Sequence, residues 1–185
     1  DAAVVFAVIV GTGTGGGIVV NRQLINGPNG ISGEWGHNPL PWPVAKELPG
    51  PACYCGHSGC IETWLSGPGL ALDHERVNGI RRDARMIVQA AELGDTRAGE
   101  TLQRYANRMA RALASVINVL DPDIIVLGGG LSNCKRLYKS VTSQWGEYVF
   151  SDRVDTRLVC AQHGDASGVR GAAWLWSSDQ VDQDC

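Results

Sequence analysis

The sequence has no apolar run long enough to cross a bilayer and no strong excess of either charge. Sixteen Lys and Arg residues stand against 19 Asp and Glu, a net charge of −3, so electrostatics give no reason to expect a nucleic acid or a membrane as partner. Nothing resembles a secretory signal, which disfavours disulfides and leads us to expect a cytoplasmic protein. The 185 residues, 44% of them hydrophobic, suffice for one domain with a sizeable core.

A start methionine is missing as well. The chain opens Asp1-Ala2-Ala3 and passes directly into the apolar run Val4–Val10. We therefore expect the natural protein to extend upstream of Asp1.

Cysteine is scarce, yet three of the six cysteines lie close together. Cys53, Cys55 and Cys60 fall within eight residues, in the spacing C-x-C-x4-C. Thiolate and imidazole are preferred ligands of zinc, and four such groups complete a tetrahedral structural site. Gly56 and Gly59 allow the short loop to fold back so that three sulfurs point at one ion. The spacing therefore predicts a zinc site.

Two questions about this site stay open at the level of the residues. His37, upstream of the cysteines, is the first choice for the fourth ligand, but His57 lies inside the loop and the spacing does not decide between them. A disulfide is the alternative for the thiols, although Cys53 and Cys55 are too close for an easy bridge and three is an odd number.

Glycine is abundant, with 24 residues, and two of its clusters follow apolar runs. The β-branched run Val4–Val10 predicts a strand buried on both faces, followed by a glycine-rich tip at 11–17 and a second strand at 18–21. Such a tip offers bare backbone N–H groups that can cradle phosphate oxygens, and a plain flexible hairpin is the alternative. A Walker loop is excluded, because no Lys-Ser/Thr pair and no helix follows.

The rest of the chain alternates between helical and strand patterns. Residues 38–52 hold five prolines, which exclude a helix or a central strand and indicate a stiff excursion between His37 and Cys53. We expect strands at 23–25, 124–127 and 157–162, and helices at 61–65, 69–77, 83–93, 96–120, 133–149 and 167–176. This alternation predicts an α/β fold, whose ligands bind beyond the strand C-termini. Both glycine clusters, 11–17 and 128–130, lie there, which favours a nucleotide site.

Together these segments resemble the ROK family of sugar kinases and sugar-responsive repressors. The resemblance covers almost the whole chain, and its most specific parts are Glu-x-Gly-His at 34–37 and Cys-x-Cys-Gly-x-x-Gly-Cys-x-Glu at 53–62. Residues 34–42, 53–56 and 168–176 look like bacterial fructokinases (mannofructokinases). The resemblance implies an actin-like, ribonuclease H-type ATPase fold with two lobes, and a homodimer. Residues 1–185 would then be a single C-terminal lobe, a mixed sheet with flanking helices and a zinc-binding insertion at about 34–62.

The resemblance also implies roles for particular residues. Zinc would bind His37, Cys53, Cys55 and Cys60, which leaves His57 as a loop residue. The sugar hydroxyls would face Glu34, His37 and Glu62; the alternatives are that Glu34 caps a turn and that Glu62 is a supporting or surface carboxylate. ATP phosphates would lie on Gly11, Thr12, Gly13 and Thr14, and the adenosine over Gly128, Gly129 and Gly130.

A complete kinase also needs a base for the sugar hydroxyl and Mg²⁺ on the ATP phosphates. The family's base is an aspartate upstream of the first strand, so we expect no catalytic base in this chain. Asp121, Asp123 and Asp165 are interpreted instead as a helix stop before proline, a strand entry and a helix N-cap.

The sequence thus favours the C-terminal lobe of an ATP-dependent hexose 6-kinase that is inactive by itself, with fructose as the first candidate and hexose identity undetermined. The alternative is the sugar-binding part of a ROK repressor, whose DNA-binding segment would lie outside these residues. A zinc-stabilised oligomerisation module is the third possibility. The intact Gly-Thr-Gly-x-Gly hairpin favours use of ATP. No nucleic acid or membrane partner is expected for the kinase.

Overall fold

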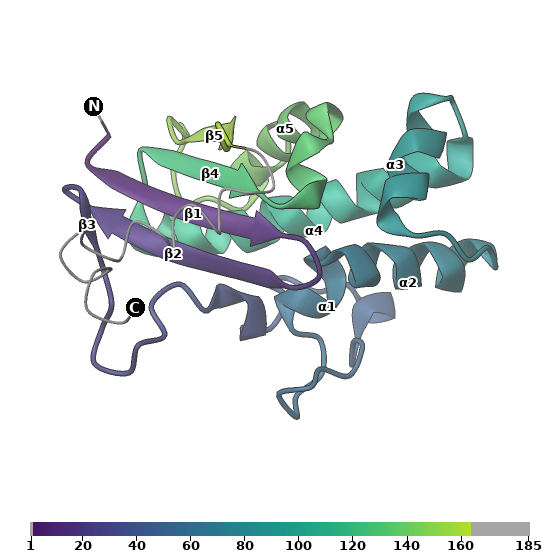
Figure 1. Ribbon diagram of the computed structural model, residues 1–185, viewed down its shortest axis with the longest axis horizontal. Helices are drawn as coiled ribbons and strands as arrows, with labels where there is room; N and C mark the ends of the chain where they lie inside the picture. Colours follow the sequence, from purple (N-terminus) through teal and green to yellow (C-terminus); the bar gives the residue numbers. More distant parts are fainter. Residues whose placement is uncertain (1, 164–185) are drawn as a thin grey trace, which may run out of the picture.

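The computed structural model describes residues 2–163. One mixed sheet of five strands, in the order β3-β2-β1-β4-β5, forms a layer with helices packed against it (Figure 1). The strands are β1 (Val4–Val10), β2 (Thr14–Val20), β3 (Gln23–Leu24), β4 (Ile124–Gly128) and β5 (Arg157–Cys160). The α/β prediction is confirmed. The helix predicted at 167–176, the fructokinase-like stretch 168–176 and Asp165 lie outside the described residues.

The hairpin of β1 and β2 is tighter than the glycine run suggested. Val10 pairs with Thr14 in the antiparallel register, so the tip consists of residues 11–13 and the glycines at 15–17 belong to β2. The prediction of a tip over 11–17 is therefore wrong. Gly16 serves close packing, because a Cβ there would lie 2.9 Å from the carbonyl oxygen of Gly33.

Within the described residues, β1 is covered on one face only, so the prediction of a strand buried on both faces is also wrong. Phe6, Val8 and Val10 alternate as buried side chains beneath the helices, whereas Ile9 on the opposite face is 41% exposed. β4 runs parallel to β1 and shows the same alternation. A continuous apolar run does not reveal which of its two faces is covered.

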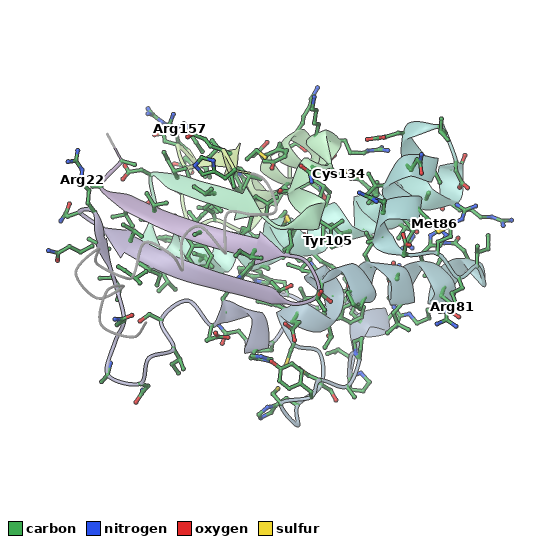
Figure 2. The ribbon with its side chains drawn as sticks, in the orientation of Figure 1. Arg22, Arg81, Met86, Tyr105, Cys134 and Arg157 are labelled. Carbon is green, nitrogen blue, oxygen red and sulfur yellow. The ribbon has the colours of Figure 1, made fainter. Side chains whose placement is uncertain are left out.

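Helix α4 (Thr96–Leu120) is the centre of the core and has the predicted bounds. Its buried face packs with α1 (Ile61–Leu65), α2 (Gly67–Asn78), α3 (Ala84–Glu92) and α5 (Lys135–Thr142). Tyr105 lies inside this layer, and its hydroxyl donates a 2.6 Å hydrogen bond to the Leu65 carbonyl (Figure 2). Arg22, Arg81 and Arg157, by contrast, project from the periphery (Figure 2). None of the helices within residues 2–163 is both long and apolar enough to cross a bilayer.

The helix predicted at 133–149 is shorter than expected and interrupted. Only α5 is α-helical; a 3₁₀ turn, η3 (Gly130–Asn133), precedes it and another, η4 (Trp145–Glu147), follows. Polar side chains satisfy carbonyls at the break, where Gln144 Nε2 donates to the Ser140 carbonyl at 2.6 Å and Ser143 Oγ to the same oxygen at 3.2 Å. Such local bonds compete with the helical ladder, so the apolar periodicity overstated the helix.

Candidate functional site

The parallel strands β1 and β4 bring the two glycine clusters together at their C-terminal ends. Ile9 lies opposite Gly128 in the register. Gly129 follows with φ of 81° and packs so tightly on the Val10 backbone that any Cβ would overlap the Val10 carbonyl oxygen. Glycine is required there both for its dihedral angle and for this close approach. The tip at 11–13 and the turn at 128–130 therefore lie at one edge of the sheet, as predicted.

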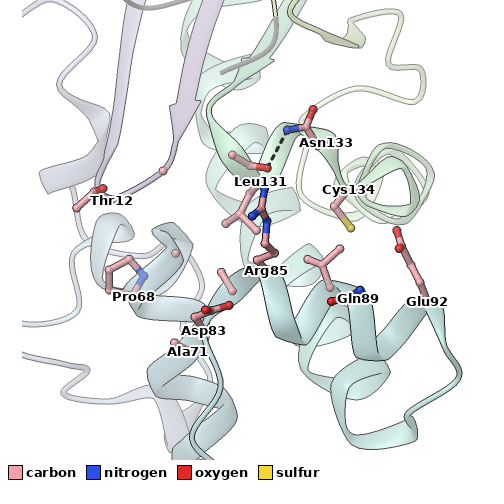
Figure 3. Close-up of a pocket in the computed structure, with 15 residues that line it drawn as sticks. Thr12, Pro68, Ala71, Asp83, Arg85, Gln89, Glu92, Leu131, Asn133 and Cys134 are labelled. Carbon is pink, nitrogen blue, oxygen red and sulfur yellow. Dashed lines mark hydrogen bonds between the residues drawn. The ribbon is translucent and has the colours of Figure 1, made fainter. Parts of the chain in front are cut away.

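One cleft, here called the helix cleft, opens between these glycines and helices α2 and α3 (Figure 3). Its volume is about 910 Å³. Figure 3 shows Arg85 directed from α3 toward Leu131 and Asn133, which follow β4. Apolar side chains and donors thus converge in one concave site, the usual composition of a small-molecule pocket. The lining residues include Gly11, Thr12, Pro68, Gln89, Gly130 and Cys134.

A second cleft of about 750 Å³, here called the sheet cleft, opens over the face of the sheet that carries Ile9. Gly11 and Thr12 border both clefts, so the hairpin tip lies between them. Three polar residues of the sheet cleft are those expected to face a sugar, and the structure brings all of them together: Glu34, His37 and Glu62.

The four predicted metal ligands converge beside the sheet cleft. One donor atom from each of His37, Cys53, Cys55 and Cys60 lies within 4.8 Å of all the others. Cys53 Sγ is 3.5 Å from His37 Nδ1, and Cys55 Sγ is 3.6 Å from Cys60 Sγ. Zinc–sulfur bonds of about 2.3 Å in tetrahedral geometry place ligand atoms roughly 3.7 Å apart, so the donor set fits zinc in chemistry and in spacing.

The loop around the cysteines folds back as its glycines indicated. Gly56 and Gly59 have φ of 92° and 73°, and Cys53 N–H donates to the His57 carbonyl at 2.8 Å. His57 Nδ1 lies 3.5 Å from Cys55 Sγ, but His57 is exposed and is not one of the four clustered residues. Hydrogen bonds from the His57 backbone and ring lower the pKa of Cys55 to about 6, which favours the thiolate that a metal needs.

Glu62 links the metal loop to the hairpin tip. It lies in α1, two residues after the predicted ligand Cys60, and its Oε2 accepts a 2.9 Å hydrogen bond from the Thr14 backbone N–H. Glu62 is thus no free surface carboxylate. Because the Thr14 N–H is taken, the tip N–H groups left for a phosphate are those of Thr12 and Gly13, which form no hydrogen bond among the described residues. The Thr14 hydroxyl is buried and has no partner within residues 2–163.

Glu34 and His37 are positioned by η1 (Trp35–His37), which lies directly on β2. Glu34 precedes this turn, but its side chain does not cap it, which contradicts the capping alternative. Trp35 Nε1 donates to the Gly15 carbonyl at 2.9 Å. The carboxylate of Glu34 is exposed and lines the sheet cleft.

Replacing Gly36 by alanine should displace η1 and destabilise the protein by about 2–4 kcal/mol, because a Cβ there would overlap the Thr14 carbonyl. Urea unfolding measures this difference. Gly15→Ala in the adjacent strand is the matched control, since a Cβ at Gly15 meets no atom within 4 Å. Equal stability of the two variants would contradict the packing of η1 on β2.

A buried ionic cluster holds the proline-rich excursion against α4. Glu47 Oε1 accepts hydrogen bonds from Arg108 Nε at 2.8 Å and Arg111 Nη2 at 2.9 Å, and Arg111 Nη1 also donates to the Trp42 carbonyl at 2.6 Å. Arg108 further pairs with Asp73 at 3.0 Å and lies 4.3 Å above the Trp64 ring. Glu47 thus anchors the excursion in the protein interior before the chain reaches the cysteines.

This cluster accounts for a short helical turn that we did not expect. The 3₁₀ turn η2 (Ala45–Glu47) lies within residues 38–52, where the prolines were predicted to exclude helix. Residues 44–48 contain no proline, and Glu47 Oε2 accepts the Val44 N–H at 3.0 Å. One turn therefore forms between the prolines.

Sequence reasoning missed several residues of the site. Tyr54, between two of the ligands, points its hydroxyl at His37 Nε2 at 2.8 Å. Arg85 and Gln89 of the helix cleft lie on α3, which was recognised only as a helix. The sequence offered one weak signal for these two residues: both are polar residues within a largely apolar helical pattern.

Two of the three aspartates set aside by the sequence analysis have structural roles. Asp121 ends α4 with φ of 46°. Asp123 Oδ2 accepts the backbone N–H groups of Ala3 and Val4, each at 2.8 Å, at the start of β1. These hydrogen bonds lower the pKa of Asp123. Both interpretations are confirmed.

Comparisons with known proteins identify relatives of this chain. The model of the ROK family matches residues 1–179. N-acetyl-D-glucosamine kinase of Pectobacterium carotovorum is 38% identical over 180 residues, which cover 95% of this chain and 59% of that protein. The chain therefore spans about three fifths of the length of such curated relatives.

Solved structures show the same fold. A ROK family glucokinase from Streptomyces griseus, in complex with glucose and AMPPNP, aligns with a TM-score of 0.82 and 26% identity over 95% of this chain and 61% of that one. A ROK family transcriptional regulator, described as a homologue of the E. coli MLC protein, aligns with a TM-score of 0.71 and 26% identity over 85% of this chain and 41% of that one. The actin-like sugar-kinase architecture is thereby confirmed, and the fold alone does not separate kinase from regulator.

Proposed function

The chain belongs to the ROK family, and on that premise we propose that it supplies the ATP- and sugar-binding C-terminal lobe of a hexose kinase. The observation that carries the proposal is the hairpin tip at 11–13, which borders the helix cleft on one side and the sheet cleft on the other. Adenosine in the helix cleft and a hexose in the sheet cleft would bring the γ-phosphate and the sugar 6-hydroxyl together at this tip.

The residues on each side suit those ligands. Free N–H groups at Thr12 and Gly13 can hold phosphate oxygens of ATP, which enters as its Mg²⁺ complex. Glu34 and Glu62 can each accept hydrogen bonds from sugar hydroxyls. Zinc, when bound to His37 and the three cysteines, supplies a crosslink that fixes the His37 imidazole. No residue of this chain is assigned as the base that takes the hydroxyl proton.

Two lines of support bear on the identity of the sugar, and they favour different sugars. The sequence resemblance favoured fructose, whereas the relatives named above act on N-acetyl-D-glucosamine or glucose. We therefore place these two pyranoses ahead of fructose. The kinase is favoured over the repressor because the curated relatives are kinases and the Gly-Thr-Gly-x-Gly tip is intact. The homodimer stays part of the proposal, and light scattering of the full-length protein tests it.

The test is sugar-dependent ADP release by the full-length protein with N-acetylglucosamine, glucose, mannose and fructose. We expect turnover with at least one sugar and none with its 6-deoxy analogue. Glu62→Gln keeps an oxygen for the Thr14 N–H but removes the charge, and should lower kcat/KM about 10- to 100-fold, the loss of one charged hydrogen bond.

Glu100→Gln, at an exposed position on α4, is the control and should leave the rate unchanged. The absence of phosphorylation with all four sugars would contradict the proposal. Binding of one of these sugars without any phosphoryl transfer would support the repressor instead.

A further inference from the structure

Tyr54 occupies a position in the sheet cleft that the roles above leave unused. It stands between the ligands Cys53 and Cys55, so its backbone is fixed on both sides, yet its side chain is 85% exposed and lines the cleft. The hydroxyl lies 2.8 Å from His37 Nε2. The two rings meet edge to face, with centroids 5.0 Å apart and planes at 89°.

The metal site determines the direction of this hydrogen bond. His37 Nδ1 lies 3.5 Å from Cys53 Sγ and is therefore the ring nitrogen that would bind the metal. A ring nitrogen that binds a metal carries no proton, so Nε2 of the neutral imidazole must carry it. Nε2–H then donates to the Tyr54 oxygen. The phenolic hydrogen of Tyr54 is therefore left to donate to another acceptor.

The cleft needs a donor of this kind. Glu34 and Glu62 only accept hydrogen bonds when ionised, whereas every sugar hydroxyl both donates and accepts. A sugar held by the two carboxylates therefore presents oxygen lone pairs that require donors. Tyr54 supplies one beside them, on a ring whose exposed face can also cover apolar sugar C–H groups.

We propose that Tyr54 is a sugar-contacting, specificity-determining residue that donates its phenolic hydrogen to an oxygen of the bound hexose while His37 holds the phenol in place. The proposal rests on the proposed sugar-kinase function. The group of the sugar that Tyr54 recognises is then an acceptor oxygen, either of a hydroxyl or of a carbonyl.

Calorimetric titration of the full-length, zinc-loaded protein with N-acetylglucosamine and glucose tests this contact. Tyr54→Phe keeps the ring and removes only the hydroxyl, and should weaken sugar binding about tenfold without changing ATP affinity, zinc content or melting temperature. Tyr148→Phe, whose ring packs on Trp42 at 5.3 Å, is the control and should bind sugar normally.

A set of monodeoxy sugars identifies the partner oxygen. One deoxy analogue should bind the parent protein more weakly than the unmodified sugar does. Tyr54→Phe should bind this analogue and the unmodified sugar almost equally, because both changes remove the same hydrogen bond. Sugar affinity within twofold of the parent, additive losses for every analogue, or a fall in zinc content in Tyr54→Phe would each overturn the inference. Failure of the parent protein to bind any of N-acetylglucosamine, glucose, mannose and fructose would overturn it together with the proposed function.

Discussion

Replacing Cys60 by alanine should abolish stoichiometric zinc binding and lower the melting temperature by about 10 °C or more. Structural zinc contributes on the order of 10 kcal/mol to small zinc-binding units, because the bound ion is part of the folded state. Cys60 is 1% exposed and is the N-cap residue of α1, so its loss releases the loop and the start of that helix. Elemental analysis and thermal unfolding of protein purified without chelator measure the two effects.

Cys134→Ala is the matched control for Cys60→Ala. Cys134 is as buried, at 2% exposure, but lies outside the four-residue cluster. The control should lose stability through its small cavity and keep its zinc. We also expect Cys60→Ala to bind sugar poorly, since Glu62 follows the lost ligand by two residues. Full zinc occupancy in Cys60→Ala, or no zinc in the unsubstituted protein, would refute the assignment of the ligands.

Replacing Glu47 by alanine should destabilise the protein by about 3–5 kcal/mol, the usual cost of leaving buried charges without their partner. Arg108 and Arg111 are 3% and 2% exposed, and both donate to Glu47 Oε1. Urea unfolding at neutral pH gives the difference. Glu100→Ala, on the exposed side of α4, is the control and should change stability by less than about 0.5 kcal/mol.

The same carboxylate predicts a dependence on pH. Burial alone would raise the pKa of Glu47, but the hydrogen bonds from Arg111 and Arg108 outweigh it and lower the pKa to about 2 from 4.5. Since the folded state holds the lower pKa, its contribution to stability is complete above about pH 4.5 and is lost as the pH falls toward 2. Glu47→Gln should flatten this part of the stability profile. An unchanged acid limb would argue against the ion pair.

Local patterns predicted the elements that rest on periodicity. α4 was found with its correct ends because its apolar positions repeat at helical spacing and the pattern stops before Asp121-Pro122. The metal ligands were found because three thiols lie close together in the sequence. Periodicity did not show the open face of β1 or the three-residue tip, because both depend on packing. It also did not show the broken helix after Asn133, which depends on competing side-chain hydrogen bonds.

Long-range polar contacts were the main gap. Arg108 and Arg111 look like solvated positions on an amphipathic helix, and only the folded chain brings Glu47 to them from more than 60 residues away. Tyr54 gave no signal either, because an aromatic residue between two cysteines is equally consistent with an exposed turn. The contacts of Glu47 form where the proline-rich excursion packs on α4, whereas the contact of Tyr54 forms where the cysteine loop meets His37.

The hydrogen bond between Glu62 Oε2 and the Thr14 N–H joins a carboxylate of the sheet cleft to the strand that follows the tip, and this tip borders both clefts. An occupant of the sheet cleft that draws the carboxylate toward itself releases a donor at the edge of the phosphate region. On the proposed function, the binding of sugar and of ATP would then be thermodynamically linked, and reciprocity would require each ligand to alter the affinity of the other by the same factor. The backbone amide of Thr14 would thus couple the binding of the two ligands.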